Sequence, residues 1–131
     1  MTQADTSDHV DEELLDEVLT LLDDEEPDGL LRACDLFRAA IPERMRDIGA
    51  ALHQGRFDDA ARASHSLRGS AGAFGARRLS SLGERLEVMC LQLDGEPAGV
   101  LLDEMRDEFR LFDDILDRRL AEVTGGRARG A

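Results

Sequence analysis

The chain has 131 residues, of which 42% are hydrophobic, a length and composition that predict one globular domain. Its formal net charge is −13, and every basic side chain is an arginine. This charge argues against nucleic acid and anionic membrane as partners, because both attract positively charged surfaces.

The cysteines and the apolar runs indicate a protein of the cytoplasm. Cys34 and Cys90 lie far apart within apolar helical patterns and match neither Cys-x-x-Cys nor a zinc-ligand spacing, so we expect two reduced core cysteines. The N-terminal residues lack the basic and then apolar pattern of a signal peptide, and no apolar run approaches the length of a membrane span. We therefore expect a cytoplasmic protein.

The sequence near the N-terminus predicts one acidic helix. Residues 1–9 are polar, and we expect them to form a flexible N-terminus. A helix is predicted over Val10–Asp23, and the sequence DEEPDG then interrupts the chain. The apolar face expected for this helix consists of Leu14, Val18 and Leu21, with Leu15 and Leu22 beside them.

Four longer helices are predicted in the rest of the chain. Apolar residues recur at steps of three and four from Leu30 to Leu52, with Pro42 as a possible bend, and Gly55 ends that helix. Further helices are expected from about residue 57 into the glycine-rich stretch, across 79–93, and across 101–120, with DGEPAG ending the one before last.

These elements predict an all-α fold. No alternating run of β-branched residues indicates a strand. Short connections favour an antiparallel four-helix bundle with an additional N-terminal helix, which packs across one end or side. We expect a single domain over residues 10–123 and a flexible C-terminal tail over 124–131. Each helix has a single apolar face, so we also expect a monomer.

The stretch HSLRGSAGAFG, residues 65–75, is unusual for a helix, because a glycine inside a helix costs about 1 kcal/mol relative to alanine. At 100° per residue the apolar stripe of Leu67, Ala71 and Phe74 lies opposite His65, which therefore points away from the core. On the side of His65 the wheel places Ala61, Arg68, Gly69 and Gly72. These small residues clear the space around the imidazole, as close approach by a partner requires.

A carboxylate is predicted beside His65. Gly75 is expected to form a tight turn, after which the next helix runs back and brings residues 85–87 level with the histidine. A carboxylate at Glu87 could accept the Nδ1 proton of His65 and leave Nε2 free as a nucleophile. A solvated Glu87, or an ion pair with Arg62 or Arg68, is the alternative.

An exposed neutral imidazole is a good phosphoryl acceptor, and Arg68 could neutralise charge on the phosphoryl oxygens. The sequence contains no Walker-type nucleotide loop, no Glu-x-x-His metal pair and no hydrolase triad. We therefore expect no autonomous ATP-dependent kinase activity, no bound metal and no cofactor. His9, in a segment expected to be irregular, and His53, at a helix end, are interpreted as ordinary surface residues, as are Ser66 and Ser70.

The segment Ala63–Glu87, ASHSLRGSAGAFGARRLSSLGERLE, resembles the signature of histidine-containing phosphotransfer (HPt) domains. The resemblance implies that His65 takes a phosphoryl group on Nε2 from a receiver-domain aspartate or a histidine kinase and passes it to another receiver aspartate. It implies that Arg68 stabilises the phosphoryl charge and that Glu87 orients the ring. The partner would dock over Ala61, Gly69 and Gly72, and the receiver would supply Mg²⁺.

Two residues depart from the family pattern: Arg68 stands where lysine is usual, and Ser64 where alanine often precedes the histidine. Arginine keeps the charge but changes its reach and geometry. Three other hypotheses remain. The chain could be a non-catalytic module that sequesters a receiver or a kinase, the phosphoacceptor part of a chemotaxis-type kinase, or a purely structural bundle.

Overall fold

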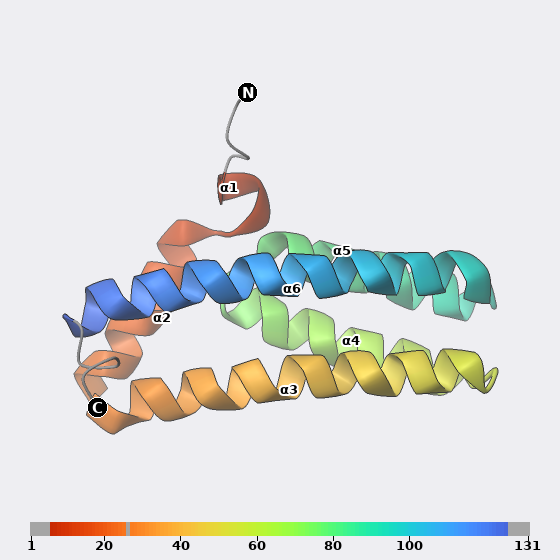
Figure 1. Cartoon of the computed structure of the whole chain (residues 1–131), viewed down its shortest axis with the longest axis horizontal. Coiled ribbons are helices and arrows are strands. Elements are labelled where there is room, and N and C mark those ends of the chain that lie inside the picture. The colour runs from red at the N-terminus through yellow and green to blue at the C-terminus, as the bar shows by residue number, and fades with distance from the viewer. Residues whose placement is uncertain (1–5, 26, 126–131) are drawn as a thin grey trace.

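The computed structural model describes residues 6–25 and 27–125, and these residues form six helices joined by short turns (Figure 1). The part of the chain described contains no strand, as predicted. The helices are α1 (Thr6–His9), α2 (Glu12–Glu25), α3 (Pro27–His53), α4 (Phe57–Ala73), α5 (Arg77–Leu91) and α6 (Gly95–Thr124).

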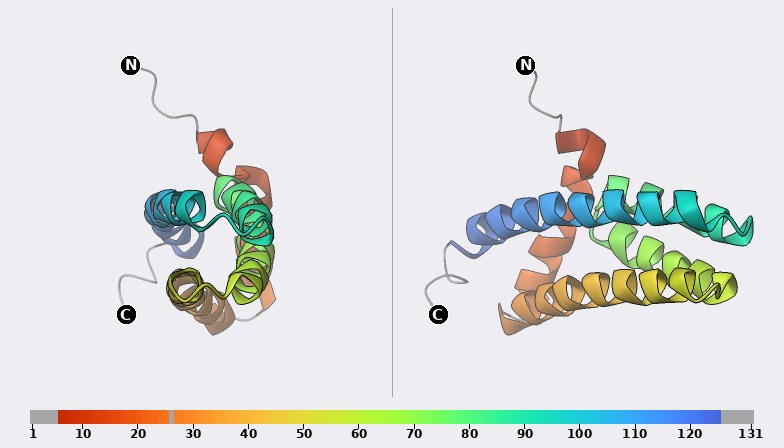
Figure 2. Two further views of the ribbon diagram at one scale, coloured as in Figure 1. Left: turned by 90° about the vertical axis from the view of Figure 1, so that its right-hand side faces the viewer. Right: turned by 45° about the vertical axis from the view of Figure 1, so that its right-hand side comes forward.

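Helices α3, α4, α5 and α6 form the antiparallel four-helix bundle that the sequence predicts. Viewed along the bundle, each of the four occupies one corner, and helices consecutive in the chain are neighbours (Figure 2). Helix α2 crosses one end of this bundle, where it contacts α3 and α6 (Figure 1). The predicted additional N-terminal helix is therefore present.

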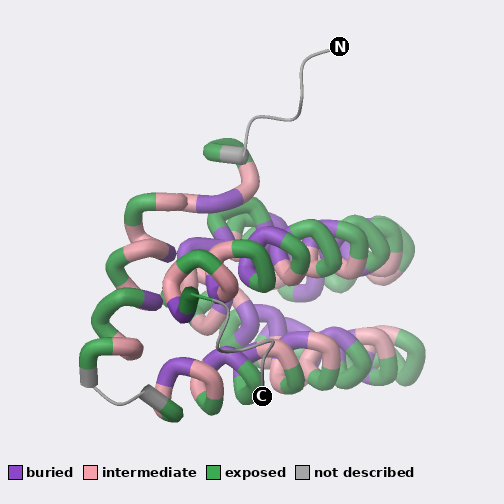
Figure 3. Tube along the Cα trace, turned by 60° about the vertical axis from the view of Figure 1, so that its left-hand side comes forward, coloured by how far each residue is buried: buried purple, intermediate pink, exposed green. Residues whose placement is uncertain are grey.

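The core follows the predicted apolar stripes. Cys34, Phe37, Ile41, Met45 and Ile48 of α3 are all buried, and buried residues line the inner sides of the bundle helices (Figure 3). Burial of each large aliphatic side chain stabilises the fold by about 1.5–3 kcal/mol relative to exposure. The expected reduced state of the cysteines agrees with the structure, in which both are buried and free.

Helix α2 packs through a different stripe from the one predicted. Leu15 and Leu19 are buried, whereas Leu21, placed on the inner face by the sequence, is 61% exposed. The prediction for Leu21 was wrong because the face of α2 that packs against α3 and α6 is the neighbouring one, which carries Leu15 and Leu19. Leu15, Leu19 and the partly buried Leu22 follow one another at steps of four and three, so α2 buries a single stripe beside the predicted one.

Polar contacts fasten the N-terminal segment to the bundle. His9 Nδ1 lies 2.8 Å from Glu108 Oε2, and Arg119 donates hydrogen bonds to Glu12 and Asp16. We call His9, Glu12 and Asp16, together with Asp11, the N-terminal clasp. Of the residues 1–9 predicted to form a flexible N-terminus, Thr6–His9 form a short helix. Residues 1–5, and residues 126–131 of the predicted tail 124–131, lie outside the described residues.

The turn between α4 and α5 is bound to the clasp. Gly75 has φ of +76°, a backbone conformation that disfavours side chains, and an added Cβ would lie 2.8 Å from the carbonyl oxygen of Asp11. The backbone amide of Asp11 donates to the Gly75 carbonyl at 2.8 Å. The predicted tight turn is therefore present, and its position fixes how α5 runs back along α4.

Candidate functional site

Helix α4 presents His65 to solvent. Helix α4 packs against the bundle through buried side chains that include Ala60, Ser64, Leu67 and Ala71. The acidic Asp58 and Asp59 in its first turn stabilise the helix by interacting with the positive end of its dipole. The side chain of His65 is 61% exposed. The predicted outward orientation of the histidine is therefore confirmed.

Two charged side chains approach the same nitrogen of the His65 ring. Glu87 Oε1, on α5, lies 3.2 Å from Nδ1, and Arg68 Nη2 lies 3.1 Å from it. Nε2 has no hydrogen-bond partner among the described residues. The structure thus brings together the three side chains that the sequence places in the site, and Arg68 lies on the Nδ1 side of the ring.

The ion pair offered as an alternative for Glu87 is also present. Arg68 Nη2 lies 4.0 Å from Glu87 Oε1, and Arg68 Nη1 lies 3.8 Å from Glu84 Oε1. Arg62 instead pairs with Asp59. Sequence analysis did not single out Glu84, although its position three residues before Glu87 places both carboxylates on one helix face.

The small residues around His65 differ in how open they are. An added Cβ at Gly69 would meet no atom within 4 Å, so this glycine leaves open space beside the histidine. At Gly72 the added Cβ would lie 3.4 Å from Ser80 Oγ, so this glycine faces α5. Ala61, placed by the wheel on the outer side, is only 5% exposed, because α4 packs against α5 as well as α3.

A shallow depression adjoins the histidine. It has a volume of about 460 Å³, and its lining includes Ala61, Arg62, His65, Glu87 and Leu91. The side chain of Leu91 is exposed and supplies an apolar wall, which sequence analysis did not identify because Leu91 lies off the buried stripe of α5. The depression combines an apolar wall with the reactive ring.

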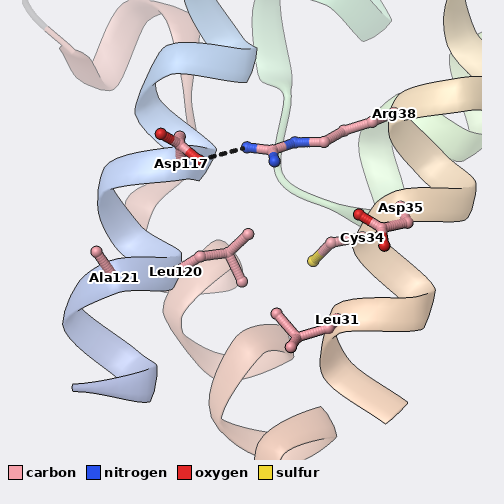
Figure 4. A pocket seen from close by; sticks show the side chains of 7 residues that line it. All are labelled: Leu31, Cys34, Asp35, Arg38, Asp117, Leu120 and Ala121. Atoms are coloured by element: carbon pink, nitrogen blue, oxygen red, sulfur yellow. Dashed lines mark hydrogen bonds and ion pairs between the residues drawn. The ribbon is translucent and has the colours of Figure 1, made fainter. Parts of the chain in front are cut away.

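A second cavity, of about 180 Å³, lies between α3 and α6 and contains no reactive group (Figure 4). Cys34 lines it, and burial raises the pKa of this thiol to about 11, which keeps it protonated at neutral pH. Arg38 at its mouth lies within ion-pair distance of Asp113 and Asp117. His65 therefore remains the stronger candidate for a reactive group.

The other sequence candidates lie apart from this site. His9 belongs to the clasp rather than to an irregular surface segment, and His53 is exposed at the end of α3. Within the described ranges, no three His, Cys, Asp or Glu side chains gather as metal ligands would. Over the same ranges, no helix combines the length and the apolar character needed to cross a bilayer.

The molecule is a helical bundle in which the exposed His65 has the carboxylate of Glu87 at Nδ1. The family model for the Hpt domain matches residues 32–121, and the chain belongs to this family. It is a histidine phosphotransfer protein of the kind that works with receiver domains and kinases in phosphorelays.

Two solved structures share the fold. Histidine-containing phosphotransfer protein B from Pseudomonas aeruginosa PAO1 superposes with a TM-score of 0.76 at 23% identity, covering 87% of this chain and 96% of its own. A rice protein assigned to the histidine-containing phosphotransfer proteins has a TM-score of 0.75 at 20% identity, covering 88% of this chain and 81% of its own. No curated protein sequence matches this chain.

Proposed function

We propose that His65 is the phosphoacceptor of this chain, and that it takes a phosphoryl group from a receiver-domain aspartate or a histidine kinase and passes it to a receiver-domain aspartate. The observation that carries this proposal is the exposed imidazole with Glu87 at Nδ1. The carboxylate favours the ring form in which Nδ1 carries the proton, and that form leaves the Nε2 lone pair available.

In the proposed transfer, the bond that forms at phosphorus is matched by one that breaks. The Nε2 lone pair attacks the phosphorus, the bond from phosphorus to the aspartyl oxygen breaks, and the aspartate leaves as a carboxylate. The ring keeps its Nδ1 proton and becomes positively charged, a charge that Glu87 stabilises. The reverse steps return the phosphoryl group to a second receiver, so His65 is an intermediate carrier.

Arg68 is proposed to neutralise the phosphoryl oxygens. Its guanidinium is adjacent to the ring, and a cation near a transferring phosphoryl group lowers the barrier through electrostatic stabilisation. In the unphosphorylated protein Arg68 lies on the Nδ1 side. The guanidinium therefore swings toward Nε2 when the phosphoryl group arrives there.

We propose that the receiver docks over Gly69, where an approaching surface meets no side chain, with Gly72 on one side along α4 and, on the other, the depression whose floor includes the largely buried Ala61. Leu91 offers an apolar contact across the depression. The chain itself is proposed to hold no cofactor, and the receiver is proposed to bring Mg²⁺. We further propose a cytoplasmic monomer without autonomous kinase activity.

The test is phosphoryl transfer from a panel of phosphorylated receiver domains of the same cell, followed by intact mass and mapping of the modified residue. The wild type should gain one acid-labile, alkali-stable phosphate on His65, and His65→Gln should gain none. His53→Gln, a matched change of another exposed histidine, should be phosphorylated like the wild type. Receivers that bind the chain but never transfer would instead support the sequestering module.

A further inference from the structure

We propose that Arg68 and Glu84 determine which nitrogen of His65 carries the proton, and hence what fraction of the molecules is nucleophilic at rest. The consequence for transfer rests on the proposed function, whereas the position of the proton can be measured without any partner. Glu84 is assigned here as a positioning residue that acts on His65 through Arg68.

The two contacts at Nδ1 require opposite proton positions. A carboxylate only accepts hydrogen bonds, so the 3.2 Å contact with Glu87 requires a proton on Nδ1. A guanidinium only donates, so the 3.1 Å contact with Arg68 requires a lone pair there. A neutral imidazole carries a single proton, and the two contacts therefore belong to two tautomers in exchange.

Only one of these tautomers can accept a phosphoryl group on Nε2. When Glu87 binds the Nδ1 proton, Nε2 has a free lone pair. When Arg68 donates to Nδ1, the proton lies on Nε2, and no lone pair is available there. A molecule in which Arg68 donates to Nδ1 therefore cannot accept a phosphoryl group on Nε2.

The backbone and Cβ of Arg68 lie against α5, and its guanidinium has few partners within reach. Ser80 Oγ donates to the Arg68 carbonyl at 3.0 Å, and a Cβ on Gly83 would lie 3.4 Å from the Arg68 Cβ. The guanidinium end lies among His65 Nδ1, Glu87 and Glu84, the last at 3.8 Å from Nη1. Two carboxylates and one neutral ring nitrogen therefore compete for one cation.

Glu84 favours the reactive tautomer in this competition. At 3.8 Å the contact between Arg68 Nη1 and Glu84 is longer than a hydrogen bond, whereas Nη2 lies 3.1 Å from Nδ1. A charge-assisted bond to a carboxylate is stronger than one to a neutral nitrogen, so shortening the contact with Glu84 draws the guanidinium from Nδ1. Without Glu84, the partners left to Arg68 are Nδ1 and Glu87. A bond from Arg68 to Nδ1 excludes the Nδ1 proton, and a bond from Arg68 to Glu87 competes for the carboxylate, so either one weakens the hydrogen bond from Nδ1–H to Glu87. An incoming phosphoryl group acts in the same direction as Glu84, because its negative charge attracts Arg68.

The test uses the full unphosphorylated chain and ¹⁵N chemical shifts of the His65 ring at about pH 9, above the ordinary titration range of histidine. Arg68→Ala should raise the fraction with the proton on Nδ1. Glu84→Gln should lower the ratio of the Nδ1–H to the Nε2–H form about twofold, the scale of an exposed ion pair. Glu43→Gln, the same change at an exposed residue of α3, should have no effect.

The double variant distinguishes action through Arg68 from a direct effect on the ring. In an Arg68→Ala background, Glu84→Gln should leave the ratio unchanged. An equal shift in both backgrounds, or identical ratios in the wild type and Arg68→Ala, would overturn the inference. A His65 that exchanges tautomers as described but is phosphorylated by no receiver would overturn the proposed function instead, so the two failures are distinguishable.

Discussion

Two regions of this molecule pair a histidine with a glutamate, and they use the pair differently. In the N-terminal clasp, His9 lies 2.8 Å from Glu108, and the two side chains are 19% and 8% exposed. On α4 and α5, His65 lies 3.2 Å from Glu87, and these side chains are 61% and 23% exposed. In both pairs the carboxylate contacts Nδ1, so this contact alone does not make a histidine a phosphoryl acceptor.

A glycine lies beside each pair, and the two glycines have distinct tasks. Gly75 is needed by the backbone, because its positive φ and the nearby Asp11 carbonyl leave no place for a side chain. Gly69 lies inside α4 with empty space where its side chain would be. The clasp therefore makes contacts within the chain, whereas the surface around His65 is open, as the proposed docking of a receiver requires.

The largest effect on stability is expected from Gly75→Ala. The new Cβ would lie 2.8 Å from a backbone oxygen, and the alanine would have to keep the positive φ of Gly75. We expect the free energy of unfolding to fall by about 2–3 kcal/mol, measured by urea denaturation. Gly69→Ala is the matched control and should instead raise it by about 0.5–1 kcal/mol. Equal losses at both positions would contradict the comparison.

Gly69→Trp should impair phosphoryl transfer while leaving the fold intact. The indole fills the space beside His65 that a partner would occupy, and we expect phosphoryl transfer from a receiver to slow about 100-fold, as misplacement of reacting groups does. Helicity measured by circular dichroism should stay unchanged. Transfer at the wild-type rate in this folded variant would show that partners do not approach over Gly69.

His9→Ala should affect stability and spare transfer. Glu108 would lose its bond to His9 and retain Arg78, 3.5 Å away, so we expect a loss of about 1–2 kcal/mol in the free energy of unfolding. His65→Ala, a change at an exposed site, should alter it by less than about 0.5 kcal/mol. In a transfer assay the order should be reversed: His65→Ala should lose phosphorylation, and His9→Ala should keep it. A His9 variant that folds but cannot be phosphorylated would contradict the assignment of His9 to a structural role.

The smallest effect is expected from Arg119→Ala. This side chain joins α6 to Glu12 and Asp16 of α2, and we expect its loss to lower the free energy of unfolding by about 1 kcal/mol. Salt screens such pairs, so the difference between variant and wild type should shrink as sodium chloride is added to the denaturation buffer. A difference that is independent of salt would assign the effect to packing of the arginine stem.

The helices and the pairing of His65 with Glu87 were predictable because both follow from local geometry. A period of three and four placed the α3 stripe, and the turn at Gly75 brought Glu87 level with His65. The partner of His9 was not predictable, because Glu108 lies 99 positions away and no local pattern joins them.

The errors at Leu21 and Ala61 have different causes. Helix α2 has two adjacent apolar stripes, and the one beside Leu21 is the one that is buried. Ala61 belongs to a helix that packs against both α3 and α5, whereas a helical wheel assumes a single buried face. The apolar wall at Leu91 was missed for a related reason. Its role depends on the depression between α4 and α5, which exists only after the two helices have packed.

The separation along the chain of the paired residues bears on the order in which the molecule assembles. His65 and Glu87 are 22 positions apart on one helical hairpin, while His9 and Glu108 are 99 apart. Closing a short loop costs less entropy and takes less time than closing a long one. During synthesis on the ribosome, the hairpin with His65 can therefore form while α6 is still being made, and the contact between His9 and Glu108 closes only after α6 has emerged.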